Sequence, residues 1–266
     1  MRNKLTEELA ICGFNAVAAA GKLHPETINR LFLRQDRFPF FTGVCKNLAA
    51  RKRPYKICED EELERICKSS HHQGVVAMIE QPVVASLTKD DLEQWVAEGL
   101  TGLVLHAIGN DHNLGAMARS AAFFGARFIV ISGADEEAQL TTSAYRVAEG
   151  GMEHAVVRRV GDTAAFLRDA SRVLVTIGAD PFARWRIRDF DAIAREQRAR
   201  LSSRVRSGGR PAGFALVIGN EETGLPDAVK RHCSALVRIP GTGNMESLNA
   251  AHAATLFLRA AFEYRE

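Results

Sequence analysis

The chain has 266 residues, of which 46% are hydrophobic and 25% are charged, which is typical of a folded protein with room for two domains. No apolar run reaches the ~18 residues that span a bilayer. Residues 1–8 are charged and lead into no signal-type apolar core, so we expect a cytoplasmic protein without a membrane partner. The net charge of +3 permits a nucleic-acid partner but does not identify one.

The cysteines and histidines give no sign of a metal site or a disulfide framework. The five cysteines form no CxxC pair and their number is odd, so we expect reduced thiols. The histidines lack metal-ligand spacing as well. We therefore expect no bound metal.

Residues 9–82 predict a small α/β domain. The pattern indicates helices near residues 13–20, 46–53 and 60–68, and strands at residues 28–33 and 74–79. Residues 83–98 carry charges around Lys89-Asp90-Asp91 and no large apolar block, so we interpret them as a linker. The second domain then covers residues 99–266.

Short apolar runs separated by helical patterns predict a parallel sheet with crossover helices in the second domain. The predicted strands are residues 103–108, 128–131, 173–177, 214–218 and 235–239. The chain ends in an alanine-rich helix from about Ser247 to Tyr264. The expected fold class is α/β.

One connection, Pro181 to Pro211, is unusually long for an α/β protein and rich in arginine. Its only acids are Asp189, Asp191 and Glu196. Such a stretch is either a solvated helix or an electrostatic footprint for phosphates, and the sequence leaves both interpretations open.

Three short polar motifs follow predicted strands, where parallel sheets bind ligands. They are Asn113-Leu114-Gly115 with Arg119, Gly219-Asn220-Glu221 with Gly224-Leu225, and Ile239-Pro240 with Ser247-Leu248-Asn249. Each alone is also compatible with a helix cap or turn, for example N-capping by Ser247. The chain lacks GxGxxG, P-loop and GxSxG signatures, which makes a dehydrogenase, an ATPase or a serine hydrolase improbable.

Together and in this order, the three motifs resemble those of the SpoU (TrmH-type) RNA 2′-O-ribose methyltransferases of the SPOUT superfamily, over about residues 100–266. Residues 9–82 resemble that family's N-terminal substrate-binding domain, which is similar to ribosomal protein L30e. The matching pieces are Gly13-Phe14-Asn15-Ala16-Val17 and His72-Gln73-Gly74-Val75.

The resemblance implies an α/β trefoil knot in the C-terminal domain, S-adenosyl-L-methionine as cofactor and a homodimer formed through that domain. It implies methylation of a ribose 2′-hydroxyl in structured RNA, with rRNA favoured over tRNA because of the L30e-like domain. By position, the cofactor-contacting residues are Gly219, Ile239 and Leu248. The catalytic and structural polar set is Arg119, Asn113, Glu221, Ser247 and Asn249.

The chain departs from the family after Asn249, where Ala250-Ala251-His252 replaces the frequent Val-Ser-Val. The lost serine hydroxyl motivates one alternative, an RNA-binding protein of this fold with weak or lost catalysis. The intact Arg119, Glu221, Ser247 and Asn249 argue against it. Arg119 also has two possible roles. It is either the base that removes the proton of the 2′-hydroxyl or a bidentate clamp on a phosphate. The clamp is favoured because a guanidinium keeps its proton well above physiological pH.

Overall fold

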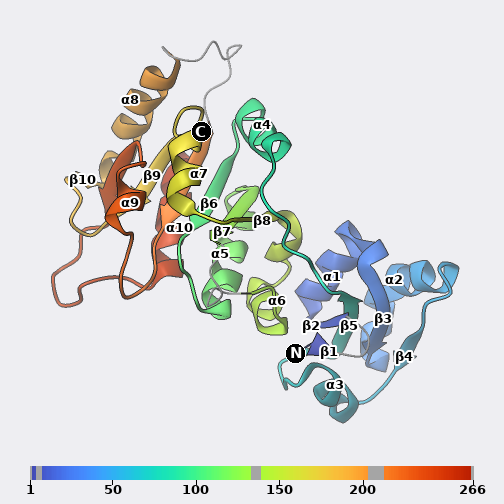
Figure 1. Cartoon of the computed structure of the whole chain (residues 1–266). Helices are drawn as coiled ribbons and strands as arrows, with labels where there is room; N and C mark the ends of the chain where they lie inside the picture. The colour runs from blue at the N-terminus through green and yellow to red at the C-terminus, as the bar shows by residue number, and fades with distance from the viewer. Residues whose placement is uncertain (1, 4–7, 133–138, 203–212, 265–266) are drawn as a thin grey trace. The chain divides into compact units, whose positions relative to one another are not determined.

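The computed structural model describes residues 2–3, 8–132, 139–202 and 213–264, which form two compact units (Figure 1). The first unit consists of Met1–Val83, Leu114–Arg119 and Gln139–His154. The second consists of Val84–Asn113, Ser120–Ala138 and Ala155–Glu266. Helix α5 (Asp111–Phe123) contributes residues to both units.

The first unit contains a five-stranded sheet in the order β1-β2-β5-β3-β4 among the described residues. Its strands are antiparallel except for the parallel pair β3 and β4. Its elements are β1 (Arg2–Asn3), β2 (Glu8–Cys12), α1 (Phe14–Leu23), β3 (Ile28–Leu33), α2 (Phe38–Ala50), β4 (Tyr55–Ile57), α3 (Asp60–Cys67), β5 (Val75–Glu80) and α6 (Thr142–Ala148).

The sequence pattern did not predict strands β1, β2 and β4, and it placed the start of α2 too late. Strand β2 is buried along its whole length, although it begins with a charged residue that the sequence pattern places in the N-terminal lead. Glu8 is tolerated there because its carboxylate forms an ion pair with Arg30. Helix α2 begins at Phe38, well before the predicted start at residue 46, with Pro39 in its first turn, where a missing N–H is harmless.

The second unit is built on a seven-stranded sheet in the order β10-β12-β9-β11-β6-β7-β8 among the described residues, with all neighbouring strands parallel. The predicted α/β fold with a mostly parallel sheet is confirmed. Its strands are β6 (Thr101–Leu105), β7 (Phe128–Ser132), β8 (Val156–Val160), β9 (Val175–Ala179), β10 (Trp185–Arg186), β11 (Phe214–Ile218) and β12 (Ala235–Arg238). Besides α5, its helices are α4 (Lys89–Ala97), α7 (Thr163–Ala170), α8 (Phe190–Ser202), α9 (Asp227–Lys230) and α10 (Ala250–Glu263).

The segment that we interpreted as a linker, residues 83–98, contains helix α4 and belongs to the second unit. The Trp95 ring is fully buried and stacks on Phe128 with ring centroids 4.9 Å apart. The indole N–H donates to the carbonyl of Leu100 at 3.0 Å. Thr88 and Asp91 form a capping box at the start of the helix. Trp95, with Leu92 and Val96 beside it, anchors a helix whose first turn is charged.

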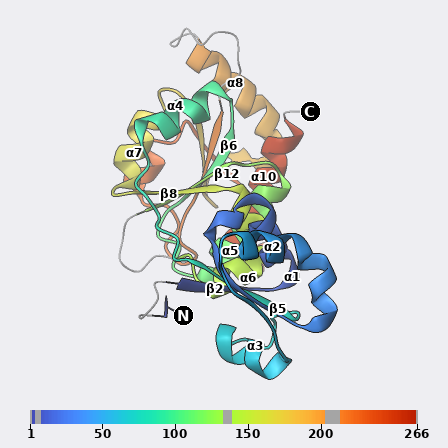
Figure 2. The same ribbon diagram turned by 90° about the vertical axis from the view of Figure 1, so that its right-hand side faces the viewer.

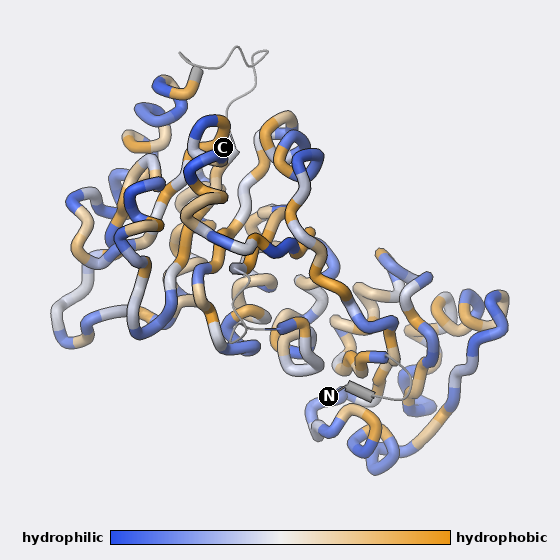
Figure 3. The backbone as a smooth tube through the Cα atoms, in the orientation of Figure 1, coloured by the Kyte–Doolittle hydropathy of each residue, from blue (hydrophilic) through white to orange (hydrophobic). Residues whose placement is uncertain are grey.

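Helices cover both faces of the large sheet (Figure 2). Trp95 of α4, Leu167 of α7 and Val229 of α9 belong to one apolar cluster with strands β6, β7 and β11. Helices α8 and α10 pack on the opposite face. Figure 3 shows that hydrophobic residues predominate along the central strands between these helices.

Only part of the arginine-rich connection can be described, because Arg204, Arg206 and Arg210 lie outside the described residues. Its helix, α8, exposes Arg195 to solvent. By contrast, the guanidinium of Arg198 lies 4.5 Å from the ring centroid of Phe214 and 4.7 Å from that of Tyr264. The stretch is therefore neither wholly solvated nor wholly available to a ligand.

Candidate active site

The three sequence motifs meet at the carboxyl edge of the parallel sheet. Strands β6 and β11 are neighbours, and β9 separates β11 from β12. Because parallel strands all end at the same edge, the segments that follow β6, β11 and β12 emerge side by side. The fold therefore brings together pieces of chain that are more than a hundred residues apart.

The loop after β11 is held tight by Asn220. Its Oδ1 accepts the backbone N–H groups of Glu222 at 2.9 Å and Thr223 at 3.1 Å. Its Nδ2 donates to the carbonyl of Ala107 at 2.8 Å, which ties this loop to the segment after β6. From the sequence, Asn220 stands out only as part of a motif. An asparagine that follows a glycine just after a buried strand is typical of an Asx turn, so this sequence position could have predicted its role.

Gly219 faces the backbone at the other end of the same loop. A Cβ atom on it would lie 2.4 Å from the carbonyl carbon of Gly224 and 2.7 Å from the backbone nitrogen of Leu225. No side chain fits there without moving the loop. A glycine is thus required for the loop to close on itself at the predicted cofactor edge.

One side chain from each motif joins a single hydrogen-bonded network. Asn113 donates from Nδ2 to Oε1 of Glu221. Asn249 donates from Nδ2 to Oδ1 of Asn113 at 3.0 Å. Asn113 is only 9% exposed, so both ends of its amide are satisfied within the protein. Three of the five predicted polar residues are therefore in direct contact.

Asn249 has a second role as the N-cap of α10. Its Oδ1 accepts the N–H groups of Ala251 at 2.9 Å and His252 at 3.4 Å. Helix α10 accordingly begins at Ala250, later than predicted, and the capping role considered for Ser247 belongs to Asn249. Ala251, which stands where the family often has serine, is buried in the first turn.

The remaining predicted cofactor residues lie along the segment between β12 and α10. Ile239 is half-buried directly after β12. Ser247 is exposed, and so are the apolar side chains of Leu248 and Met245, at 48% and 81%. Nε of Arg238, one residue before this segment, is buried and has no hydrogen-bond partner among the described residues. The segment presents backbone and apolar side chains on the outside of the unit.

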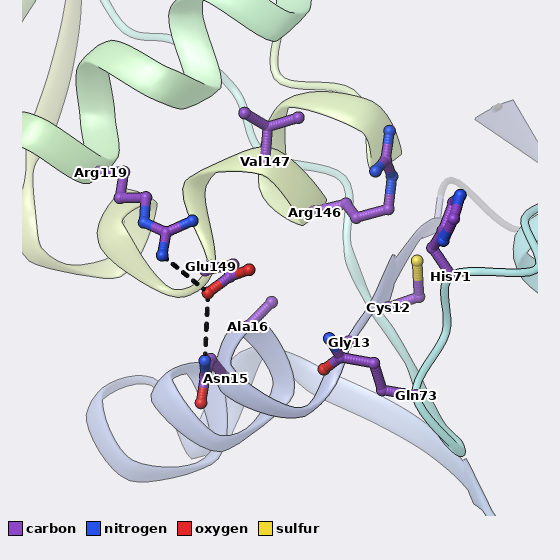
Figure 4. A pocket seen from close by; sticks show the side chains of 10 residues that line it. All are labelled: Cys12, Gly13, Asn15, Ala16, His71, Gln73, Arg119, Arg146, Val147 and Glu149. Carbon is purple, nitrogen blue, oxygen red and sulfur yellow. Dashed lines mark hydrogen bonds and ion pairs between the residues drawn. The ribbon is translucent and has the colours of Figure 1, made fainter.

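Arg119 lies outside this network. It follows Asn113 by six residues on α5, and at about 3.6 residues per turn the two side chains leave the helix on different sides. Its Nη2 forms an ion pair with Oε2 of Glu149 at 3.1 Å. Both side chains line a cavity of about 280 Å³ within the first unit, together with Asn15, His71 and Arg146 among others (Figure 4).

His106 is a further polar group at the carboxyl edge, and no sequence motif pointed to it. It follows β6 directly, and its Nδ1 lies 3.1 Å from the hydroxyl oxygen of Thr163. Burial lowers the pKa of this imidazole below its ordinary value.

Among the described residues, no group of His, Cys, Asp and Glu side chains has the arrangement of a metal site. Within residues 2–3, 8–132, 139–202 and 213–264, no helix combines the length and the apolarity that crossing a bilayer requires.

Comparison with known families shows where the chain belongs. The model of the SpoU rRNA Methylase family matches residues 101–259. A second family, described as RNA 2′-O ribose methyltransferase substrate binding, matches residues 10–84. The chain is a member of the SpoU rRNA methylase family, as the three motifs had indicated.

Curated relatives match over almost the whole chain. YfiF of Escherichia coli O157:H7, an uncharacterized tRNA/rRNA methyltransferase, is 31% identical over 97% of this chain and 69% of its own length. The 23S rRNA (guanosine-2′-O-)-methyltransferase RlmB of Nitrosomonas europaea is 28% identical over 97% of this chain and 92% of its own length.

Solved structures share the fold. The AdoMet-bound rRNA methyltransferase from Sinorhizobium meliloti has a TM-score of 0.72 at 22% identity, over 97% of this chain and 88% of that one. The SpoU methyltransferase AviRb from Streptomyces viridochromogenes, in complex with AdoMet, also has a TM-score of 0.72, at 23% identity over 100% and 94%.

Proposed function

We propose that the protein transfers the methyl group of S-adenosyl-L-methionine to a ribose 2′-hydroxyl of structured RNA, with rRNA favoured over tRNA. The observation that carries this proposal is the contact of Asn113, Glu221 and Asn249, one from each motif, at the carboxyl edge of the sheet. Support for ribose as the acceptor comes from the relatives named as guanosine-2′-O-methyltransferases and from the N-terminal family match.

The residues at this edge fit an adenosyl cofactor. Gly219 lets the loop after β11 close tightly on the backbone of Gly224 and Leu225, and Ile239 begins the segment that leaves β12 at the same edge of the sheet. Exposed apolar atoms of Leu248 and Met245 are available to cover an adenine ring. Two related structures are described as AdoMet complexes, which supports the same choice of cofactor. Bound there, the cofactor supplies a methyl group already activated on a sulfonium.

The residues of this chain then have to align and hold the RNA. Asn113, Glu221 and Asn249 fix the loops after β11 and β12 relative to α5, so we assign them positioning roles. We assign Arg119 a contact with the phosphate next to the target ribose, because a guanidinium fork matches a phosphate and does not release its proton. Ser247, exposed before α10, is available to contact the ribose.

We also propose that the protein is a homodimer formed through its C-terminal domain, residues 99–266, with the family's trefoil knot. Exposed aromatic side chains in the second unit support this: Phe123 is 79% exposed and Phe262 is 38% exposed. The Phe124 ring joins Phe123 and Phe262, with ring centroids 5.0 and 5.9 Å away. Large exposed aromatic groups of this kind are typical of interfaces.

The test is methyl transfer itself. The protein is incubated with labelled S-adenosyl-L-methionine and, separately, with rRNA and tRNA from cells lacking the gene. Modified ribose positions are then mapped by resistance to alkaline cleavage. Label at one 2′-oxygen of rRNA is expected. Label on a base contradicts the 2′-hydroxyl, label on tRNA alone contradicts the rRNA preference, and RNA binding without label supports the alternative of lost catalysis.

A further inference from the structure

The turn that follows helix α6 packs directly on the backbone of Arg119. A Cβ atom on Gly151 would lie 2.7 Å from Cα and 2.9 Å from the backbone nitrogen of Arg119. One helical turn earlier, a Cβ atom on Gly115 would lie 2.5 Å from the carbonyl oxygen of Ala144 in α6. Helix α5 therefore rests against α6 and its C-terminal turn through glycines at two places, which fixes where the side chain of Arg119 starts.

The same turn also supplies the partner of the Arg119 side chain. Oε2 of Glu149 lies 3.1 Å from Nη2 of Arg119 and accepts a hydrogen bond from Nδ2 of Asn15 at 3.2 Å. Figure 4 shows both contacts converging on the Glu149 carboxylate, at the wall of the cavity. With two partners on one oxygen, the carboxylate is drawn toward Arg119, although both side chains are partly exposed to solvent.

We propose that Glu149 is a positioning residue for Arg119, an inference that rests on the proposed function. The carboxylate holds the guanidinium through Nη2 alone, and the described residues offer no hydrogen bond to Nε or Nη1. Nη2 carries two hydrogens, so the guanidinium edge that Glu149 does not occupy, formed by the second Nη2 hydrogen and one neighbouring nitrogen, is left to bind a phosphate. Glu149 thus sets the direction in which Arg119 presents its remaining donors to the RNA.

The backbone at Glu149 supports a role for its side chain. The residue ends α6 in the left-handed conformation, with φ 45° and ψ 46°. Glycine is the usual residue at this place in a helix terminus, and any Cβ there is strained. A glutamate at this strained position is accounted for if its carboxylate is needed for the contact with Arg119.

This geometry makes Glu149→Gly the informative variant, because glycine adopts the observed backbone without strain and removes the side chain that carries the carboxylate. We expect kcat for methyl transfer to fall about a hundredfold, since small misplacements of an orienting group have effects of that size. The affinity for S-adenosyl-L-methionine and the melting temperature should stay at wild-type values. Glu149→Gln keeps an oxygen acceptor and should lose only about tenfold.

The matched control is Glu93→Gln on α4, which removes a carboxylate from a surface ion pair with Lys89 and should retain full activity. A further control uses Arg119→Ala, with residual rates measured in single turnovers at excess enzyme. In that background Glu149→Gly should change the rate less than about twofold, because no guanidinium is left to position.

The outcomes separate the two proposals. Wild-type protein that transfers no methyl group to RNA overturns the proposed function and this inference with it. If wild type and Glu93→Gln are active, wild-type kcat in Glu149→Gly overturns the positioning role alone. The positioning role is also overturned if Glu149→Gly slows the Arg119→Ala variant as strongly as it slows wild type, or if its loss of activity tracks a loss of cofactor binding.

Discussion

At the scale of single residues, asparagine amides make the connections of the candidate site. Asn113 donates to Glu221 and accepts from Asn249, and Asn249 donates to Asn113 while its oxygen caps α10. Asn220 likewise uses its oxygen within its own loop and its nitrogen toward Ala107. An amide is suited to this because it carries a donor and an acceptor on one rigid plane, which a carboxylate or an ammonium does not.

The network makes Asn113→Asp a sharper test than Asn113→Ala. The carboxylate still accepts from Asn249, but it loses the donor to Glu221 and places two carboxylates together. We expect the aspartate variant to lose about 1–3 kcal/mol of unfolding free energy and most methyl transfer at pH 7. Urea unfolding measures the first and an RNA methylation assay the second.

The control for this prediction is Gln94→Glu on α4, the same amide-to-carboxylate change beside an exposed carboxylate, Glu98, where wild-type activity is expected. Wild-type stability and activity in Asn113→Asp would mean that the contact with Glu221 has no energetic or functional weight.

The sequence identified the members of this network but not their contacts. The three motifs were recognised as a set by resemblance, whereas their adjacency depends on the order of β6, β11, β9 and β12 in the sheet. Local patterns do not contain that order. The N-cap of α10 was also ambiguous, because serine and asparagine both cap helices. The contact of Asn249 with Asn113 distinguishes the two, and it is a long-range feature.

At the scale of elements, the strands at the centre of the large sheet were predictable from their apolar runs, and a charged strand at its end was not. The buried runs of β6, β7 and β11 were found close to their observed bounds. Strand β8 was missed because Arg158 and Arg159 interrupt its apolar character at the end of the sheet, where it is only half-buried. Helix α4 was missed because its apolar residues, Leu92, Trp95 and Val96, are few and are separated by charged and polar ones.

Arg158 and α4 are linked by an ion pair that predicts a pH dependence. Arg158 and the Thr88 cap hold the pKa of Asp91 at about 2, below its ordinary value of 3.8. Because the pKa of Asp91 is lower in the folded protein, the interactions of its ionised carboxylate stabilise the fold fully above about pH 4. This contribution is lost as the pH falls through about 2. Compared by urea unfolding at pH 7, 4 and 2.5, wild type should exceed Asp91→Asn in stability by a margin that shrinks only below pH 4. A constant margin contradicts the assignment.

The exposed arginines around α8 predict a separate effect on RNA. Replacing Arg184, Arg188 and Arg195 with glutamine should weaken RNA binding. It should also reduce the magnitude of the slope of log affinity against log salt concentration by up to about 3. Cofactor affinity should not change. Arg198 is left intact because it packs on Phe214 and Tyr264.

The matched control replaces Arg168 and Arg172, on or just after α7 on the other face of the sheet, and should leave the salt dependence unchanged. An unaltered slope in the α8 variant would mean that these arginines are only a solvated surface.

At the scale of the whole molecule, the position of Arg119 raises the question of which subunit it serves. Arg119 leaves α5 on a different side from Asn113 and is held by Glu149. In the proposed homodimer, Arg119 of one subunit would act at the cofactor edge of its partner. Composition and local pattern carry no information on such an arrangement, so it rests on an experiment with mixed subunits.

The experiment combines two variants that are each inactive. Arg119→Ala should lose nearly all methyl transfer but keep cofactor binding. Gly219→Val should lose cofactor binding, because its side chain would collide with the backbone of Gly224. If the site is shared between subunits, a mixed dimer has one intact cofactor edge facing one intact Arg119, so activity should return to at most about half that of wild type. If each subunit is self-sufficient, every site in the mixed dimer lacks one component. Mixed dimers confirmed by native mass spectrometry and devoid of activity would exclude the shared site.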